Sequence, residues 1–171
     1  SKFLGGHHDL CAGVLVGEAS LIAQARGFAC RFGSVASPMD AWLTCRGLRT
    51  LDVRLDRAEA NARAVSECLR ARRDVAEVHY PGWGNMLSFD VGGDDRARAV
   101  IEALAGIIPL VVSLGGTATS LSHPATSSHR GMDPEQRLSL GIPDGLLRLS
   151  LGLEASDTLL AELIRTLDRC A

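Results

Sequence analysis

The chain has 171 residues, 46% of them hydrophobic, and a formal net charge of −2, which is an ordinary composition for a globular protein. Its arginines alternate with acidic residues rather than forming a basic patch, which excludes the usual kind of nucleic-acid-binding surface. No apolar run approaches the ~20 residues of a membrane-spanning helix, and no secretory signal is recognisable, so we expect a cytoplasmic protein without a membrane partner.

The N-terminal part predicts one strand and three helices. The apolar run 10–16 has the length of a buried strand, and a helix is expected over 18–28. Ser37 and Pro38 are typical of a helix start, because serine caps a helix and proline fits its first position. From 48 to about 73, apolar residues recur every three or four positions, which predicts a long amphipathic helix.

The rest of the chain predicts a small sheet with helices. Strand patterns occupy residues 75–80, 85–91, 107–114 and 146–151, and helical patterns follow Gly92 and span 157–169. The order is strand, strand, helix, strand, strand, helix. We therefore expect a small α+β layer, in which an antiparallel or mixed sheet carries helices on one face.

Lys2 is the residue with the clearest chemical potential. It is the only lysine among 18 basic residues, and all the others are arginine. A buried lysine can lose its proton and attack a carbonyl carbon, whereas arginine stays protonated. A Schiff base on a side chain of this protein can therefore form only at Lys2. The alternative is a solvated lysine on a frayed terminus.

Metal chemistry is not expected. The five cysteines form no CxxC pair, and neither His7-His8-Asp9 nor His123 with His129 has the spacing of a zinc enzyme. The histidines are better interpreted as hydrogen-bonding groups.

Four ordered segments resemble the Cys/Met-metabolism family of pyridoxal-phosphate enzymes, which includes the cystathionine synthases and lyases and methionine γ-lyase. They are the Ser-Lys-Phe-Leu-Gly-Gly-His-x-Asp motif at 1–9, the stretch 38–51, the strand that ends in Tyr-Pro-Gly at 80–82, and the signature over 112–154. The chain looks like the C-terminal part of such an enzyme.

The resemblance implies an α/β architecture, the aspartate-aminotransferase-like type I fold of pyridoxal-phosphate-dependent transferases. Residues 1–50 would be the tail of the cofactor-binding large domain, with the end of its sheet. Residues 51–171 would form the long connecting helix and the small C-terminal domain. Full-length members of the family are homotetramers, so a homo-oligomer is expected.

The resemblance also assigns roles to individual residues. Lys2 would hold pyridoxal 5'-phosphate and then take the Cα proton of the substrate, and Ser1 would contribute to the phosphate pocket. Arg148 would grip the substrate α-carboxylate, because a guanidinium fork matches a carboxylate in bidentate fashion. Ser113 would assist it, and Ser128 would support the arginine.

The reaction implied is elimination or replacement at the β or γ carbon of sulfur-containing amino acids. The alternative is a catalytically silent C-terminal fragment or assembly module, because the cofactor contacts that relatives place upstream cannot be identified here. Two departures concern the substrate range. Ala118 stands where cystathionine-handling relatives tend to have glutamate, and only Trp83 and Gly84 replace a longer charged segment.

Overall fold

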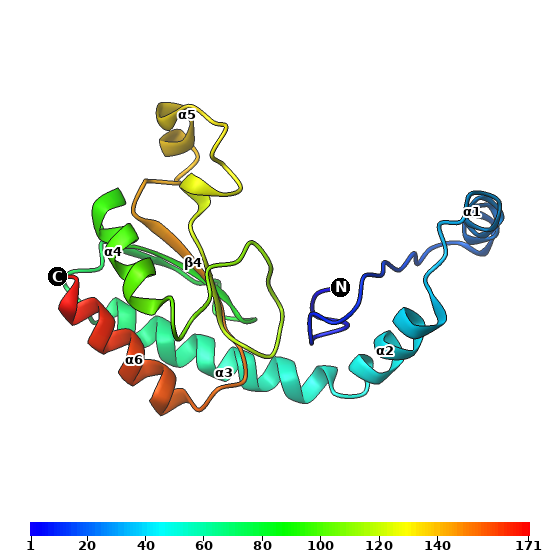
Figure 1. Ribbon diagram of the computed structural model, residues 1–171, viewed down its shortest axis with the longest axis horizontal. Helices are drawn as coiled ribbons and strands as arrows, with labels where there is room; N and C mark the ends of the chain where they lie inside the picture. Colours follow the sequence, from blue (N-terminus) through cyan, green and yellow to red (C-terminus); the bar gives the residue numbers. More distant parts are fainter. The chain divides into compact units, whose positions relative to one another are not determined.

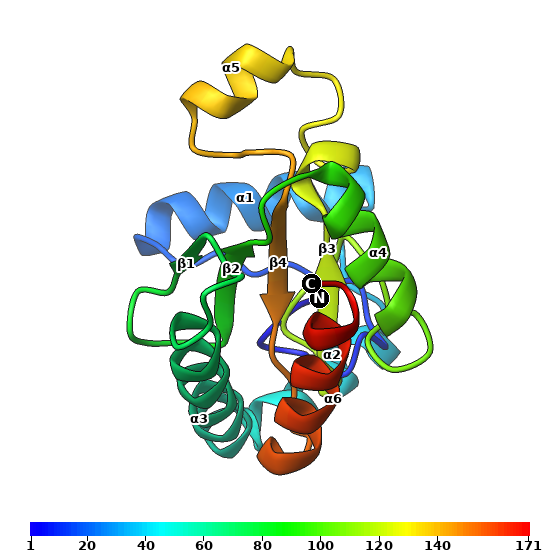
Figure 2. The same ribbon diagram turned by 90° about the vertical axis from the view of Figure 1, so that its left-hand side faces the viewer.

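The computed structural model describes residues 1–171, and the chain forms two compact units, 1–51 and 52–171. Figure 1 labels the α-helices and strand β4, and Figure 2 labels the other strands. The first unit contains α1 (Ala19–Phe32) and α2 (Pro38–Leu48), and the long helix α3 (Leu51–Arg70) leads into the second. The second unit continues with β1 (Glu77–His79), β2 (Met86–Asp90), α4 (Asp94–Leu104), β3 (Ser120–Ser122), the 3₁₀ turn η1 (Pro124–Thr126), α5 (Pro134–Ser139), β4 (Leu146–Ser150) and α6 (Ser156–Arg169).

In the first unit, the predicted helices are confirmed and the predicted strand is wrong. Helix α2 starts as expected, with Pro38 in its first turn and the Ser37 hydroxyl accepting a hydrogen bond from the Asp40 amide at 3.1 Å. Residues 10–16 form no strand, and Val16 is 92% exposed. A strand needs a neighbour to pair with its backbone groups, and no segment of the described chain offers one to this run.

The second unit contains a four-stranded antiparallel sheet in the order β1-β2-β4-β3. Strands β1, β2 and β4 lie where the sequence predicts them. The expected strand over 107–114 is wrong, since Pro109 has no N–H to donate and only an isolated parallel bridge joins Leu110 to Leu121. Strand β3 and helix α5 were not predicted, because both are short and polar.

The core lies on one face of this sheet. Leu87 and Phe89 of β2 pair with Leu149 and Leu147 of β4, so all four side chains point to the same side. Helices α3, α4 and α6 cover that side (Figure 2). They contribute the buried residues Ala62, Val65, Leu69, Ala97, Val100, Leu104, Leu159, Leu163 and Leu167. The opposite face of the sheet is therefore free to carry polar groups.

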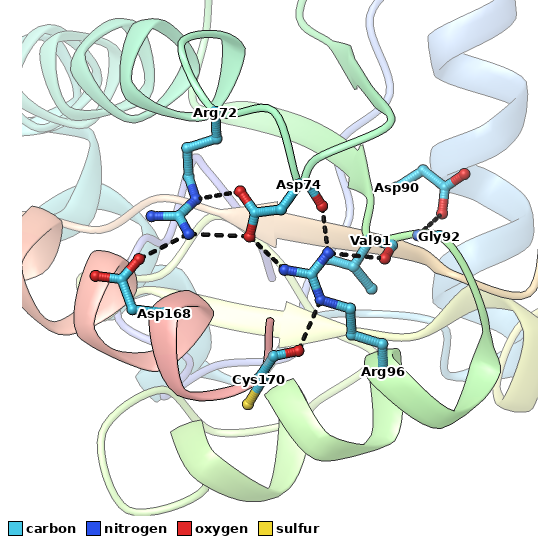
Figure 3. Close-up of polar contacts among 8 residues, drawn as sticks. All are labelled: Arg72, Asp74, Asp90, Val91, Gly92, Arg96, Asp168 and Cys170. Atoms are coloured by element: carbon cyan, nitrogen blue, oxygen red, sulfur yellow. Dashed lines mark hydrogen bonds and ion pairs between the residues drawn. The ribbon is translucent and has the colours of Figure 1, made fainter.

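An ion-pair network joins the turn that follows α3 to α4 and α6 at one end of the core (Figure 3). The Arg72 guanidinium donates two hydrogen bonds of 2.9 Å to Asp74 and forms a 2.8 Å ion pair with Asp168. Arg96 bonds the same Asp74 carboxylate and donates through Nε to the Cys170 carbonyl oxygen at 2.9 Å. The hydrogen bonds from Arg72 and then Arg96 lower the pKa of Asp74 to about 2.

The helices of this fold include none that is both long and apolar enough to cross a membrane.

Candidate active site

Arg148 lies on the polar face of the sheet, as the alternation of its strand predicted. In the strand register it stands directly opposite Ser88 on β2 and Ser122 on β3, and its neighbours Leu147 and Leu149 point into the core. Its Nε atom is buried and has no hydrogen-bond partner. A buried unpaired donor costs ~1–3 kcal/mol. A bound carboxylate would remove that cost, because its two oxygens match the donors of the guanidinium.

The loop that carries Ser113 is attached to the strand that carries Arg148. The backbone amide of Gly115 donates to the Ser150 hydroxyl at 2.9 Å, and Ser150 lies two positions beyond Arg148 on the same face of β4. Gly115 has φ 74°, a conformation that favours glycine. The Ser-Leu-Gly and Arg-Leu-Ser motifs therefore meet through one hydrogen bond, between Gly115 and Ser150.

Gly152 allows a second close approach of the same loop to the end of β4. A Cβ atom at Gly152 would overlap the backbone of residues 117–119. The Gly152 amide donates to the Thr119 hydroxyl at 2.9 Å, and that hydroxyl donates to the Glu154 carboxylate at 2.8 Å. The Gly-x-Glu part of the C-terminal signature thus serves the architecture of the site rather than its chemistry.

Asn61 of α3 binds the backbone just after β4, and the sequence analysis did not identify it. Its side-chain amide donates to the carbonyl oxygens of Gly152 and Glu154 at 2.9 and 3.0 Å, and the Ser156 hydroxyl donates back to it at 2.6 Å. Asn61 is completely buried, beside apolar Ala62. The usable signal was a polar residue on the apolar side of an amphipathic helix, where a buried amide must have partners.

Ser128 is exposed, and its hydroxyl lies 2.8 Å from Nδ1 of His129. His123 is buried, with Nε2 2.7 Å from the Asp144 carbonyl oxygen and Nδ1 3.0 Å from the Thr126 hydroxyl. No group of three or more histidine, cysteine, aspartate or glutamate side chains is arranged to hold a metal ion.

Lys2 belongs to the first unit, where its side chain is exposed on a tight turn. The Gly6 amide donates to the Lys2 carbonyl oxygen at 2.6 Å, which closes the turn. The turn rests on α2 at Gly47, where a Cβ atom would overlap the carbonyl oxygen of Gly5. The Ser1 hydroxyl donates to the Ala12 carbonyl oxygen at 3.1 Å and accepts from its amide at 3.0 Å.

The expected chemistry needs an amine for the cofactor aldehyde and a cation for the substrate carboxylate, and the chain has a residue for each. Lys2 is exposed, as in the solvated-lysine alternative, and lacks the burial on which the Schiff-base interpretation relied; its turn is held against α2, and its amine is sterically accessible to an aldehyde. A cavity of about 290 Å³ adjoins the turn, and Ser1, Ala12, Thr44 and Cys45 are among its lining residues. The unpaired Nε of Arg148 fits an amino-acid carboxylate. Lys2 and Ser1 belong to the first unit, and Ser113, Ser128 and Arg148 to the second.

Comparison with known proteins gives one consistent answer. Residues 1–168 match the family described as Cys/Met metabolism PLP-dependent enzyme. L-Methionine gamma-lyase of Pseudomonas putida is 37% identical over 190 residues, which cover 100% of this chain and 48% of that protein. Cystathionine beta-lyase of Lactococcus lactis subsp. cremoris (strain MG1363) is 33% identical over 99% of this chain and 49% of its own length.

The solved structures agree with the sequences. Cystathionine gamma synthase from Xanthomonas oryzae pv. oryzae, in complex with cystathionine, superposes with a TM-score of 0.90 at 38% identity, over 99% of this chain and 48% of that one. The chain thus spans about half the length of the relatives it matches. It belongs to the Cys/Met-metabolism family of PLP-dependent enzymes and has the α/β fold of their solved structures.

Proposed function

We propose that this chain supplies the cofactor-binding lysine and the carboxylate-binding arginine of a trans-sulfuration enzyme. That enzyme eliminates or replaces the β or γ substituent of a sulfur-containing amino acid. The relatives are named as methionine γ-lyase, cystathionine lyases and cystathionine γ-synthase, which supports this class of reaction. The observation that carries the proposal is the buried, unpaired Nε of Arg148 on the polar face of the sheet.

Each residue would have one task. Pyridoxal phosphate, when bound, supplies an electron sink for the charge that develops at the substrate Cα. The Lys2 amine is the attachment point and, once released, the base that takes the Cα proton. Arg148 would hold the α-carboxylate with help from Ser113, and Ser128 would support the arginine. Ser1 contributes its hydroxyl to the phosphate pocket. To do so, the hydroxyl must first break the hydrogen bond that it donates to the Ala12 carbonyl oxygen.

The architecture of the proposed enzyme follows from the family. Residues 1–50 would form the tail of the cofactor-binding large domain, and residues 51–171 the connecting helix and the small domain. We propose a cytoplasmic homo-oligomer, in which other segments cover the apolar side chains of the first unit. Helix α1 has no buried residue, and Phe28 and Phe32 are 61% and 68% exposed.

The same exposure favours a second candidate, a catalytically silent module of such an enzyme. With α1 uncovered and residues 10–16 unpaired, the first unit has little packing to hold the Lys2 turn rigid. A loose turn would bind the cofactor weakly and turn over slowly, because catalysis requires a fixed geometry.

Borohydride trapping separates the candidates. The purified chain is incubated with pyridoxal phosphate, reduced, digested and mapped by mass spectrometry, with the α-amine of the chain as an internal reference. We expect the cofactor mass on Lys2 to exceed that on the α-amine, and to be lost in Lys2→Arg, which keeps the charge. Equal labelling of both amines, as in urea-denatured chain, would refute the role of Lys2.

A turnover assay completes the test. Release of a keto acid from methionine or cystathionine by the loaded chain, abolished in Arg148→Met, supports the enzyme. Specific labelling of Lys2 without keto-acid release supports the silent module.

A further inference from the structure

Asn85 is a buried side-chain amide that immediately precedes strand β2, and its exposed fraction is 3%. Its Nδ2 donates to the Leu151 carbonyl oxygen at 2.7 Å and to the Ser150 hydroxyl at 3.3 Å. Its Oδ1 is buried and has no hydrogen-bond partner. The fold therefore uses the donor half of this amide and not its acceptor half.

The orientation of the Asn85 amide is determined by Leu151. A backbone carbonyl oxygen can only accept a hydrogen bond, so the amino group and not Oδ1 must face it. A reversed amide would bring two oxygens together without a proton between them. The Leu151 amide donates back to the Asn85 carbonyl oxygen at 2.9 Å, which holds the two backbones beside each other. The second proton of Nδ2 is then directed at Ser150.

The Ser150 hydroxyl accepts from two donors at once. One is Nδ2 of Asn85, and the other is the backbone amide of Gly115, 2.9 Å away. A hydroxyl oxygen has two lone pairs, so these two bonds occupy both. Ser150 is 2% exposed, so bulk water does not replace either donor. Asn85 thus restrains the side chain that anchors the loop of the Ser-Leu-Gly motif to β4.

We propose that Asn85 is a positioning residue of the candidate site, which acts through Ser150 on the loop that carries Ser113. Its donated bond keeps the Ser150 oxygen in place for the Gly115 amide. Gly115 lies two positions beyond Ser113, and Ser150 lies two positions beyond Arg148. The functional meaning of this contact rests on the proposed substrate role of Ser113 and Arg148. The coupling between Asn85 and Gly115 is measurable without any ligand.

A double-mutant cycle tests this coupling in the ¹⁵N-labelled 171-residue chain. The first readout is the NMR shift of the Gly115 amide proton, which should move upfield in Asn85→Ala as its hydrogen bond weakens. Asn85→Asp keeps the shape of the side chain but removes both donors at neutral pH, so it should move the resonance in the same direction. Once Ser150→Ala has removed the acceptor, Asn85→Ala should produce no further shift.

The second readout is the affinity of the chain for L-methionine. Asn85→Ala should weaken it by about three- to tenfold, the size expected from one neutral hydrogen bond. In the Ser150→Ala chain the same substitution should weaken it no further. The matched control is Asn61→Ala, which removes the side chain of another buried asparagine, one that bonds the carbonyl oxygens of Gly152 and Glu154. It should lower stability without moving the Gly115 resonance.

The outcomes separate this inference from the proposed function. An unchanged Gly115 resonance in Asn85→Ala, or equal effects of that change with and without the Ser150 hydroxyl, overturns the positioning role. A resonance that moves in Asn85→Ala but not in Asn85→Asp also overturns it, because packing rather than donation would then be responsible. Coupling to Gly115 in a chain that does not bind L-methionine supports the role of Asn85 and refutes the proposed substrate site. If Asn85→Ala does not fold, Asn85→Ser provides a milder variant with one shorter donor, and its shift should have the same sign.

Discussion

Replacing Asp74 by asparagine should destabilise the second unit by about 2 kcal/mol at pH 7. The carboxylate has its pKa lowered from 3.8 to about 2, first by the hydrogen bonds from Arg72 and then by those from Arg96. Each pKa unit corresponds to ~1.4 kcal/mol of preference of the folded state for the charged carboxylate. The side chain is 27% exposed, so solvent screens this interaction only in part. Asparagine keeps the size and removes the charge.

The sign of the pH dependence follows from the direction of the shift. A carboxylate whose pKa is lower in the folded state contributes its full stability above the unfolded-state pKa and loses it as the pH falls towards the folded-state pKa. The difference between the original chain and Asp74→Asn should therefore be complete at pH 7 and about half as large at pH 3.

Urea unfolding, followed by circular dichroism at both pH values, measures that difference. Glu162→Gln is the control, because it breaks an exposed pair with Arg165 three residues along one helix and should cost only ~0.5 kcal/mol. The reasoning would be refuted if Asp74→Asn cost no more than this control at pH 7. It would also fail if the cost stayed constant between pH 7 and pH 3.

Three further substitutions test the packing at the end of β4 and the role of Arg148. Gly152→Ala should destabilise by ~1–3 kcal/mol in urea, because its methyl group meets the backbone of 117–119, whereas Gly106→Ala, with open space around it, should not destabilise the chain. Asn61→Ala should cost ~2–3 kcal/mol, since two carbonyl oxygens lose their donor; a cost below ~0.5 kcal/mol would contradict the bridging role. Arg148→Met should leave the melting temperature equal or higher, because methionine removes a buried unpaired donor. It should also abolish amino-acid binding. A clear loss of stability would show that the guanidinium is structural.

Sequence periodicity predicted the elements whose pattern is long enough to repeat. Helix α3 and strands β2 and β4 have apolar residues at the spacing of their own geometry, and they are the elements that build the core. The runs 10–16 and 107–114 were misread because β-forming composition says nothing about a partner strand. Strand β3 was missed because its three residues, two of them serine, give no alternation to read.

Some features of the candidate site could likewise be predicted from local sequence, and others could not. The side of β4 on which Arg148 lies follows from its position between two leucines, so local sequence was sufficient. The unpaired state of its Nε and the position of Ser122 across the sheet depend on register, which one strand alone does not determine. The bridging role of Asn61 depends on residues more than 90 positions away, such as Gly152.

The hydrogen bonds of Asn61, Thr119 and Ser150 have a consequence for motion. They join helix α3, the loop that carries Ser113 and the strand that carries Arg148 into one cooperative unfolding unit. Amide protons of that loop, such as the one on Gly115, should exchange with solvent as slowly as those of the central strand. For the proposed role of Ser113 and Arg148, the consequence is that the loop and the strand move together, so that a carboxylate bound by both residues would meet a preformed site.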